Sequence, residues 1–265
     1  MYLYSMKIFT FILIAIYFSA SSQAELKKTA EINCSEKTFL TDHMGNVYIV
    51  SGKNIIKYSH EGEKLYEYSN NRLGNIDASD VSDPLRIMLF YHDFNQLVFL
   101  NKELAEISEP ILIDDLGAGQ AETACASSSG GFWIYSSNSQ QILYFNKNLE
   151  QVYQSENLSA LTGSDEIPVF MTEQNGMLYV SIPENGVLLF DQFGTYFKTI
   201  PIKNLHSFQV FDNELVYFAD NRLKAYNYQL LEFSDVSELT IESDYARIQN
   251  NRLFVLKENK INAYE

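Results

Sequence analysis

The residues of this chain that could support chemistry are mainly acids in four long, polar segments. The segments are residues 70–77, 112–122, 157–166 and 234–244. Together with one further histidine, they provide the candidate binding residues Arg72, Asp77, Asp114, Asp115, Glu122, Asp165, Glu166, His206, Glu242 and Asp244. Such side chains hold a cation, a peptide or a sugar only if the fold brings them together. As isolated loop residues they cap turns or face water.

A calcium or magnesium site needs several oxygen atoms at one point. Asp77, Glu122, Asp165 and Asp244 are the acids that could provide them, and each lies in a different segment. No EF-hand spacing occurs, and zinc is not expected because the histidines are far apart at His43, His60, His92 and His206. The sequence therefore predicts no metal or cofactor, with calcium left open.

The sequence predicts no catalytic residues. It contains no Gly-x-Ser-x-Gly motif, no P-loop and no dinucleotide-binding fingerprint. A Ser/His/Asp triad assembled from distant segments stays open, although no motif supports it. Trp133, in "GFWIY", could stack on a sugar ring, but packing in the core is the expected role. Whether the chain is an enzyme is left undecided, with binding favoured over catalysis.

The N-terminus has the features of a signal peptide. Lys7 precedes the uncharged apolar stretch "IFTFILIAIYFSA", and the small residues Ser22 and Ala24 fit a cleavage site before Glu25. The alternative is a retained anchor, but the stretch is shorter than the roughly 20 residues of a spanning helix. Residues 1–24 are therefore predicted to be removed, which gives a periplasmic or secreted protein.

The composition of the chain limits its partners and its redox chemistry. The net charge is −15, so the surface repels nucleic acid and anionic lipid. Cys34 and Cys125 could form a disulfide in an oxidising compartment. Two cysteines do not make a disulfide framework, and we expect two buried, unpaired thiols instead.

A repeat of about 40 residues runs through the chain. Short apolar segments end in an aromatic residue or leucine, and a polar turn such as "YFNKNL" (144–149) follows. The anchors of this repeat lie 36 to 45 residues apart, at Tyr58, Leu100, Phe145, Phe190, Tyr226 and Tyr264. This period is typical of helical repeats or propeller blades. The segments within each unit are short, rich in β-forming residues and separated by Gly, Asn, Asp and Ser, which favours blades.

Each unit contains four candidate strands, so the sequence predicts an all-β fold, a six-bladed β-propeller of four-stranded antiparallel blades. The fourth strand of the second unit is placed at 105–110. Five or seven blades would follow if this weak unit were misassigned. The predicted blades are residues 35–70, 75–113, 122–155, 166–202, 206–239 and 243–265.

The sixth unit stops at Glu265, just after its third strand. The segment 26–34, "LKKTAEINC", precedes the first blade and has no other place in the repeat. We therefore predict that 26–34 forms the outer strand of the last blade and closes the ring, which leaves no large open sheet edge. Residues 25–265 are expected to form one domain.

Residues 41–69 resemble a blade of the NHL-like six-bladed propellers of the type found in secreted bacterial proteins. The resemblance rests on the opening "TDHMGN", the later "SHEG" turn after an aromatic residue, and "LGAGQAE" (116–122), which is similar to the link between blades in that family. Blades 2, 5 and 6 lack the opening motif. The resemblance implies a propeller fold, but the family includes scaffolds, binding proteins and a few enzymes.

The expected function is therefore an exported, non-enzymatic propeller that binds a protein or peptide, or acts as a scaffold, in the bacterial cell envelope. Its site is expected on the face that carries the long links between blades, because function concentrates on loops held by a rigid scaffold. One alternative is a metal-dependent hydrolase similar to the lactonases among related propellers. Another is a propeller that binds a sugar or another small ligand.

Overall fold

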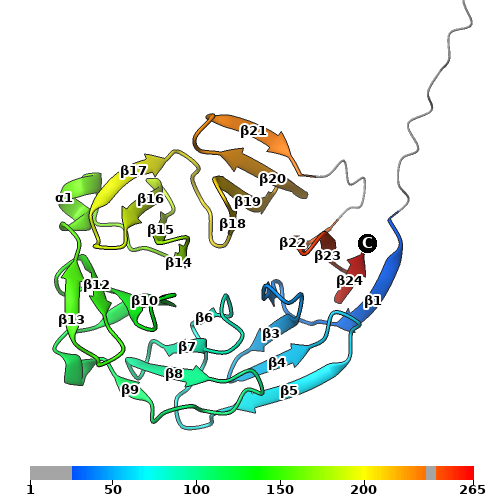
Figure 1. The fold of residues 1–265 in the computed structure, drawn as a ribbon, viewed down its shortest axis with the longest axis horizontal. Helices are drawn as coiled ribbons and strands as arrows, with labels where there is room; N and C mark the ends of the chain where they lie inside the picture. The colour runs from blue at the N-terminus through cyan, green and yellow to red at the C-terminus, as the bar shows by residue number, and fades with distance from the viewer. Residues whose placement is uncertain (1–25, 237–242) are drawn as a thin grey trace, which may run out of the picture.

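The protein is a ring of six antiparallel four-stranded sheets around a central axis (Figure 1). The computed structural model describes residues 26–236 and 243–265, and the predicted signal peptide lies outside them. Within the described residues no helix is long and apolar enough to cross a membrane. The prediction of a six-bladed propeller is confirmed.

Blades 1 to 3 follow one another in sequence. Blade 1 consists of β2 (Leu40–Thr41), β3 (Val47–Ser51), β4 (Asn54–Tyr58) and β5 (Lys64–Ser69). Blade 2 consists of β6 (Ala78–Asp80), β7 (Ile87–Tyr91), β8 (Gln96–Leu100) and β9 (Ile111–Leu112). Blade 3 consists of β10 (Ala121–Ala126), β11 (Phe132–Ser136), β12 (Gln141–Phe145) and β13 (Gln151–Gln154).

Blades 4 to 6 complete the ring. Blade 4 consists of β14 (Phe170–Gln174), β15 (Met177–Ile182), β16 (Gly186–Asp191) and β17 (Tyr196–Ile200). Blade 5 consists of β18 (Gln209–Phe211), β19 (Glu214–Ala219), β20 (Arg222–Asn227) and β21 (Glu232–Asp235). Blade 6 consists of β22 (Tyr245–Gln249), β23 (Arg252–Lys257), β24 (Lys260–Tyr264) and β1 (Lys28–Asn33).

The two ends of the ring carry different connections. We call one end the turn face, because it carries the first-to-second and third-to-fourth strand turns, such as 42–46 and 59–63. We call the other the link face, because it carries the blade-to-blade links, such as 70–77. In the described parts of these links there are two short helices, a 3-10 helix at Asp114–Leu116 and α1 at Leu158–Thr162.

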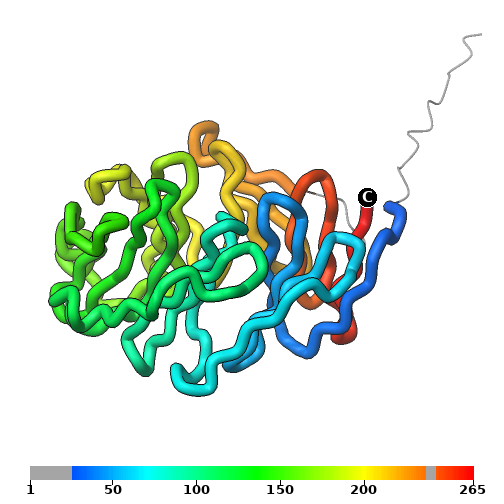
Figure 2. The backbone as a smooth tube through the Cα atoms, turned by 60° about the horizontal axis from the view of Figure 1, so that its bottom comes forward, coloured from blue at the N-terminus to red at the C-terminus, as the bar shows by residue number. Residues whose placement is uncertain are grey.

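Ring closure uses the N-terminal strand, as predicted. β1 pairs antiparallel with β24, and the main chains of Lys27 and Glu265 exchange two hydrogen bonds beyond the paired strands. Figure 2 shows β1, in blue, alongside the red C-terminal strand. Hydrogen bonds from Lys260 and Lys28 lower the pKa of the exposed Glu31 to about 2. Chain ends more than 200 residues apart therefore form one blade.

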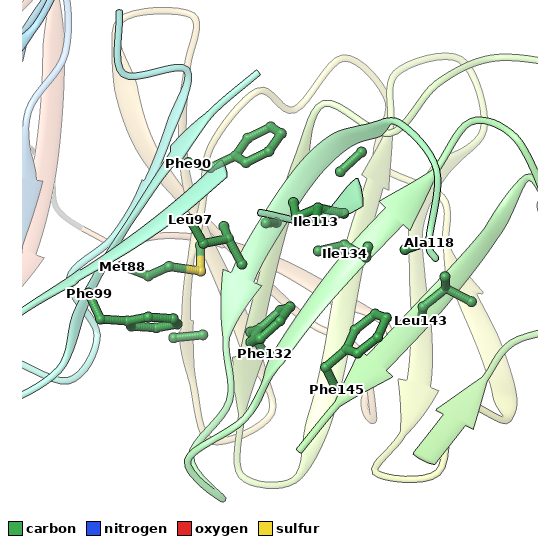
Figure 3. Close-up of a cluster of buried hydrophobic side chains, with 13 residues drawn as sticks. Met88, Phe90, Leu97, Phe99, Ile113, Ala118, Phe132, Ile134, Leu143 and Phe145 are labelled. Atoms are coloured by element: carbon green, nitrogen blue, oxygen red, sulfur yellow. The ribbon is translucent and has the colours of Figure 1, made fainter. Parts of the chain in front are cut away.

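The core consists of six apolar clusters, one between each pair of neighbouring blades. Figure 3 shows the cluster between blades 2 and 3, where Met88 and Phe99 meet Phe132 and Phe145. Successive side chains of a strand point to opposite faces, so Trp133, next to Phe132, packs toward blade 4. Trp133 is a core residue, as expected. Each blade thus buries apolar side chains on both faces.

The recurring polar turn has one physical cause. In "YFNKNL" the Asn146 side-chain oxygen accepts hydrogen bonds from the main-chain N–H groups of Asn148 and Glu150. Leu149 then takes a positive φ of 62°. Asn101 and Asp191 accept the corresponding pairs of N–H groups in blades 2 and 4. Asn and Asp recur because their short side chains satisfy the turn's own backbone.

The predicted outer strand of blade 2 is wrong in position. Residues 105–110 form only an isolated bridge between Leu100 and Glu106, and the outer strand is β9 at Ile111–Leu112. Pro110 has no N–H group for the ladder and restricts the residue before it. Regular pairing therefore begins only after Pro110.

The closing strand should contribute strongly to stability. Removing residues 26–34 deletes the outer strand of blade 6 and exposes the cluster beneath Ile32. We expect the melting temperature to fall by more than about 10 °C, measured by circular dichroism. Ile32→Ala alone should lower the free energy of unfolding, measured with urea, by about 2–4 kcal/mol. The matched control Glu31→Ala, exposed on the same strand, should cost much less than Ile32→Ala, because ion pairs at the surface contribute little. Equal melting temperatures for the full and shortened chains would contradict closure by β1.

Candidate functional site

A cavity of about 230 Å³ lies in the central channel of the ring. Five of the six innermost strands contribute to its wall, β2, β6, β14, β18 and β22. Most of the lining residues are polar or aromatic, and they include Thr41, His43, Asp80, Ser82, Phe170, Thr172, Gln174, Phe208, Gln209, Phe211, Arg247 and Gln249. Of the described residues on this wall, Asp80 is the only carboxylate and Arg247 the only arginine or lysine.

The two ends of the cavity differ in their access to solvent. Toward the link face, the rings of Phe170 and Phe208 pack edge to face with 4.9 Å between centroids, and Phe208 is buried. Toward the turn face, the lining residues His43, Ser82 and Gln174 are exposed. The exposed rim of the cavity is therefore on the turn face.

Side chains of the innermost strands join neighbouring blades by hydrogen bonds to the main chain. The Asp80 carboxylate of blade 2 accepts from the N–H groups of Ser82 and, in blade 3, Ala126. Gln209 of blade 5 donates to the carbonyl of Ile248 in blade 6 and accepts from its N–H group. Burial raises the pKa of Asp80 above its ordinary value of 3.8. These contacts join blade 2 to blade 3 and blade 5 to blade 6 at the inner wall.

Arg247 projects from β22 into this wall and is 8 % exposed. Its guanidinium donates to the hydroxyl oxygens of Thr41 (3.4 Å), Ser207 (3.3 Å) and Tyr245 (3.1 Å). None of the ion pairs in the described part of the chain includes Arg247. A nearly buried positive charge is thus surrounded by neutral partners.

The sequence prediction did not include Arg247. It lies within the predicted sixth blade (243–265), and the prediction looked for sites only in loops. One signal was present, a single arginine in a strand otherwise expected to be buried, because arginine is seldom buried without a partner. Thr41, Ser207 and Tyr245 carried no signal of their own, since they come together only when blade 6 meets blades 1 and 5.

Asp77 and Glu122 are brought together on the link face through His92. The Asp77 carboxylate accepts from the main-chain N–H of His92, and the His92 ring lies 3.1 Å from the Glu122 carboxylate. Both acids come from the predicted set. The sequence analysis named His92 only among the four separated histidines and did not include it among the site residues.

The other predicted acids are bound to their own or adjoining loops. Four of them accept a local hydrogen bond, from Asn95 to Asp114, Ser159 to Asp165, Glu184 N–H to Glu166 and Glu258 N–H to Asp244. Asp115 lines a separate cavity of about 510 Å³ between the outer parts of blades 2 and 3. Arg72 and His206 are exposed. Glu242 lies outside the described residues. The prediction of a site among these ten residues stays a prediction.

The two cysteines are free thiols in the structure. Cys34 and Cys125 are buried and unpaired, as expected. Burial raises the pKa of the Cys125 thiol well above its ordinary value. No group of three or more His, Cys, Asp or Glu residues in the described ranges is arranged to hold a metal ion. The calcium alternative therefore stays a prediction.

No family model and no curated protein matches this sequence. Similar solved structures include the WD40 domain of Neurospora crassa Pan2, with a TM-score of 0.63 and 7% identity over 90% of this chain and 94% of that one. Virginiamycin B lyase from Staphylococcus aureus has a TM-score of 0.57 and 14% identity over 88% of this chain and 82% of that one. BBS1N, solved in complex with ARL6DN, has a TM-score of 0.53 and 10% identity over 83% of this chain and 74% of that one. At these identities the likeness shows the propeller fold, and the NHL-like resemblance stays a prediction.

Asp80 should make the stability of the ring depend on pH. The pKa of Asp80 is higher in the folded than in the unfolded protein, so the protonated carboxyl contributes to the stability of the fold. This contribution is complete below pH 3.8 and is lost as pH rises through the raised pKa. Asp80→Asn cannot ionise, so from pH 4 to 7 its free energy of unfolding should rise relative to wild type. The change is about 1.4 kcal/mol for each unit of pKa shift.

Urea unfolding at several pH values would measure this difference. Asp83→Asn, exposed in the adjoining turn, is the matched control and should show a much smaller change. If the difference in free energy of unfolding between Asp80→Asn and wild type were constant from pH 4 to 7, the raised pKa of Asp80 would be contradicted.

Proposed function

We propose that this chain is an exported, NHL-like β-propeller that binds a protein or peptide partner in the bacterial cell envelope, at the channel cavity on the turn face. The observation that carries the proposal is this cavity, which has an exposed rim, walls from five blades and a nearly buried arginine. Binding sites are typically concave, with a few placed polar groups. At about 230 Å³ the cavity suits one side chain or a chain end of a partner better than a whole drug-sized ligand.

The surface around the rim supports a macromolecular partner. Lateral hydrogen bonds link the turns on this face, from Asn250 to the carbonyl of His43, from Arg86 to the carbonyl of Gly131 and from Ser128 to the Glu173 carboxylate. Such a cross-linked surface changes little on binding, which lowers the entropic cost of association. Similar folds include both BBS1N, solved with a protein partner, and a lyase. The fold alone therefore does not choose between binding and catalysis.

A second candidate function is acid–base catalysis on the link face, as in the hydrolase alternative. It is favoured by the contact of 3.1 Å between the His92 ring and Glu122, since such a pair can transfer a proton. The two side chains are 40% and 21% exposed, and neither lines the channel cavity. We rank it below binding for that reason. Chemical modification of side chains would test this function. A ligand, such as a sugar, that protects His92 from modification and leaves the channel residues reactive would favour it.

Export predicts a defined N-terminus. Cleavage after Ala24 gives a mature chain that begins at Glu25, because small residues precede this point and the apolar stretch ends just before it. Intact-mass measurement and N-terminal sequencing of protein from the periplasm or medium would test this. Recovery of chains that begin at Met1 from the membrane fraction would contradict it.

A bulky side chain at the rim should block the partner. Gln174 is exposed, ends β14 and lines the cavity, so Gln174→Trp fills the entrance at little cost to folding. We expect at least a tenfold loss of any envelope component that co-purifies with the mature protein, measured by quantitative mass spectrometry. The matched control is Gln151→Trp on the exposed outer strand of blade 3. Equal recovery with both variants would place the partner elsewhere.

A further inference from the structure

We propose that Arg247 anchors a carboxylate-binding site in the central channel. The inference rests on the proposed function, because it names the chemistry of the group that enters the same cavity. It starts from Arg247, a residue that is about nine-tenths buried and whose guanidinium has no carboxylate among its hydrogen-bond partners in residues 26–236 and 243–265. Burying a charge without a counter-charge is costly. An anion in the cavity would remove that cost.

The guanidinium is only loosely held by its present neighbours. Its three contacts are 3.1–3.4 Å long, whereas charge-assisted N–H···O bonds are typically about 2.7–2.9 Å. Arginine has five N–H donors. Within the described part of the chain only Nε and Nη1 of Arg247 make hydrogen bonds. The Nη2 donors are left for a group in the cavity that Arg247 lines.

The hydroxyls around Arg247 add further donors. A hydroxyl that accepts from the guanidinium still has its own O–H to donate. Ser207 and Tyr245 lie 3.3 Å apart, so one of these two O–H groups is used between them. The O–H of Thr41 remains, and Thr41 lines the same cavity. The local set is therefore one cation and O–H donors, which is complementary to an anion.

The charge of the surroundings favours a single negative charge. The protein carries a net charge of −15, and Asp80 lines the same cavity. Both oppose a dianion such as phosphate more strongly than a monoanion. A carboxylate matches the planar fork of a guanidinium in two parallel hydrogen bonds. The occupant is thus a carboxylate group, either of a small free acid or at an acidic residue or C-terminus of a partner.

Acetate tests the site without any partner. In purified mature protein at pH 7 and constant ionic strength, sodium acetate should raise the melting temperature by roughly 2–4 °C once it exceeds its Kd several-fold. Acetamide, which has the same shape and no charge, should have no such effect. Inorganic phosphate should stabilise less than acetate. No shift with acetate, or a larger shift with phosphate, would overturn the carboxylate assignment.

Variants show whether Arg247 is responsible. Arg247→Met should abolish the acetate shift, and Arg247→Lys should reduce it, because lysine lacks the bidentate fork. The matched control is Arg252→Met, which removes another partly buried arginine, on β23, that does not line the channel cavity. It should keep the full shift. An acetate shift that survives in Arg247→Met would overturn the proposal.

A second measurement is available if Arg247→Met does not fold. Titration of wild-type protein with acetate should shift the amide resonances of Arg247 and Thr41 by NMR and leave that of Leu65, on the outer strand of blade 1, unchanged. Uniform shifts across the chain would count against the site. Peptides with free and amidated C-termini then distinguish a chain end from a free acid, since only the free terminus should compete with acetate if a chain end is the occupant.

The outcomes separate this inference from the proposed function. If Gln174→Trp loses the envelope partner while acetate has no effect on wild type, the channel binds a partner through another chemistry. If acetate binds through Arg247 while Gln174→Trp keeps its partner, the carboxylate site stands and the proposed function does not.

Discussion

The structure depends on the burial of both faces of every blade. A four-stranded sheet with apolar side chains on both sides exposes a large apolar area unless a neighbour covers each face. In β11, Phe132 contributes to the cluster with blade 2, and the adjacent Trp133 contributes to the cluster with blade 4. No blade is stable alone on this account, and a row of blades would leave two apolar faces uncovered. A closed ring covers all of them, which is why blade 6 must be completed by β1 from the other end of the chain.

The channel wall combines aromatic residues such as Phe170 and Phe208 with polar ones such as Thr41 and Gln209. The innermost strands are joined by hydrogen bonds between side chains and main chain, as at Asp80 and Gln209. This arrangement leaves a small cavity with fixed walls. Polar groups on such walls cannot move away to solvent. The Arg247 guanidinium therefore has to find its hydrogen-bond partners within the channel.

Much of the fold could be predicted from the sequence because its causes are local. Asn146 and Asp191 mark turns by binding the main chain within four residues of themselves, so the turn is visible in the sequence as a repeat. The closing strand followed from counting strands, since the last unit lacked one. Blade 2 was placed less well, because the turn after Leu100 is long and Pro110 delays pairing.

The cavity could not be predicted in the same way. Its wall is formed by residues from five blades, and their separations in sequence carry no period that distinguishes a channel residue from any other inner-strand residue. The link-face acids drew attention because they lie in long polar segments. The structure pairs most of those that it describes with nearby donors, as between Ser159 and Asp165, and joins only Asp77 and Glu122 through one residue, His92.

Three other buried or half-buried cations that join neighbouring blades have partners of a different kind from those of Arg247. Lys57 donates to the carbonyl of Lys102, Arg86 to that of Gly131 and Lys198 to that of Tyr228, with N···O distances of 2.7–3.0 Å. Each of these contacts joins one blade to the next.

A carbonyl oxygen only accepts, so it is a fitting end point for a structural cation. Arg247 also spans blades, but it reaches hydroxyls, over longer distances, and these groups donate as well as accept. A cation needed only to join blades is better satisfied by the carbonyls that the other three use. Hydroxyls around a guanidinium at the wall of a cavity instead leave a set of donors that an anion completes, and this difference in partner chemistry is the strongest reason to regard the channel as a binding site.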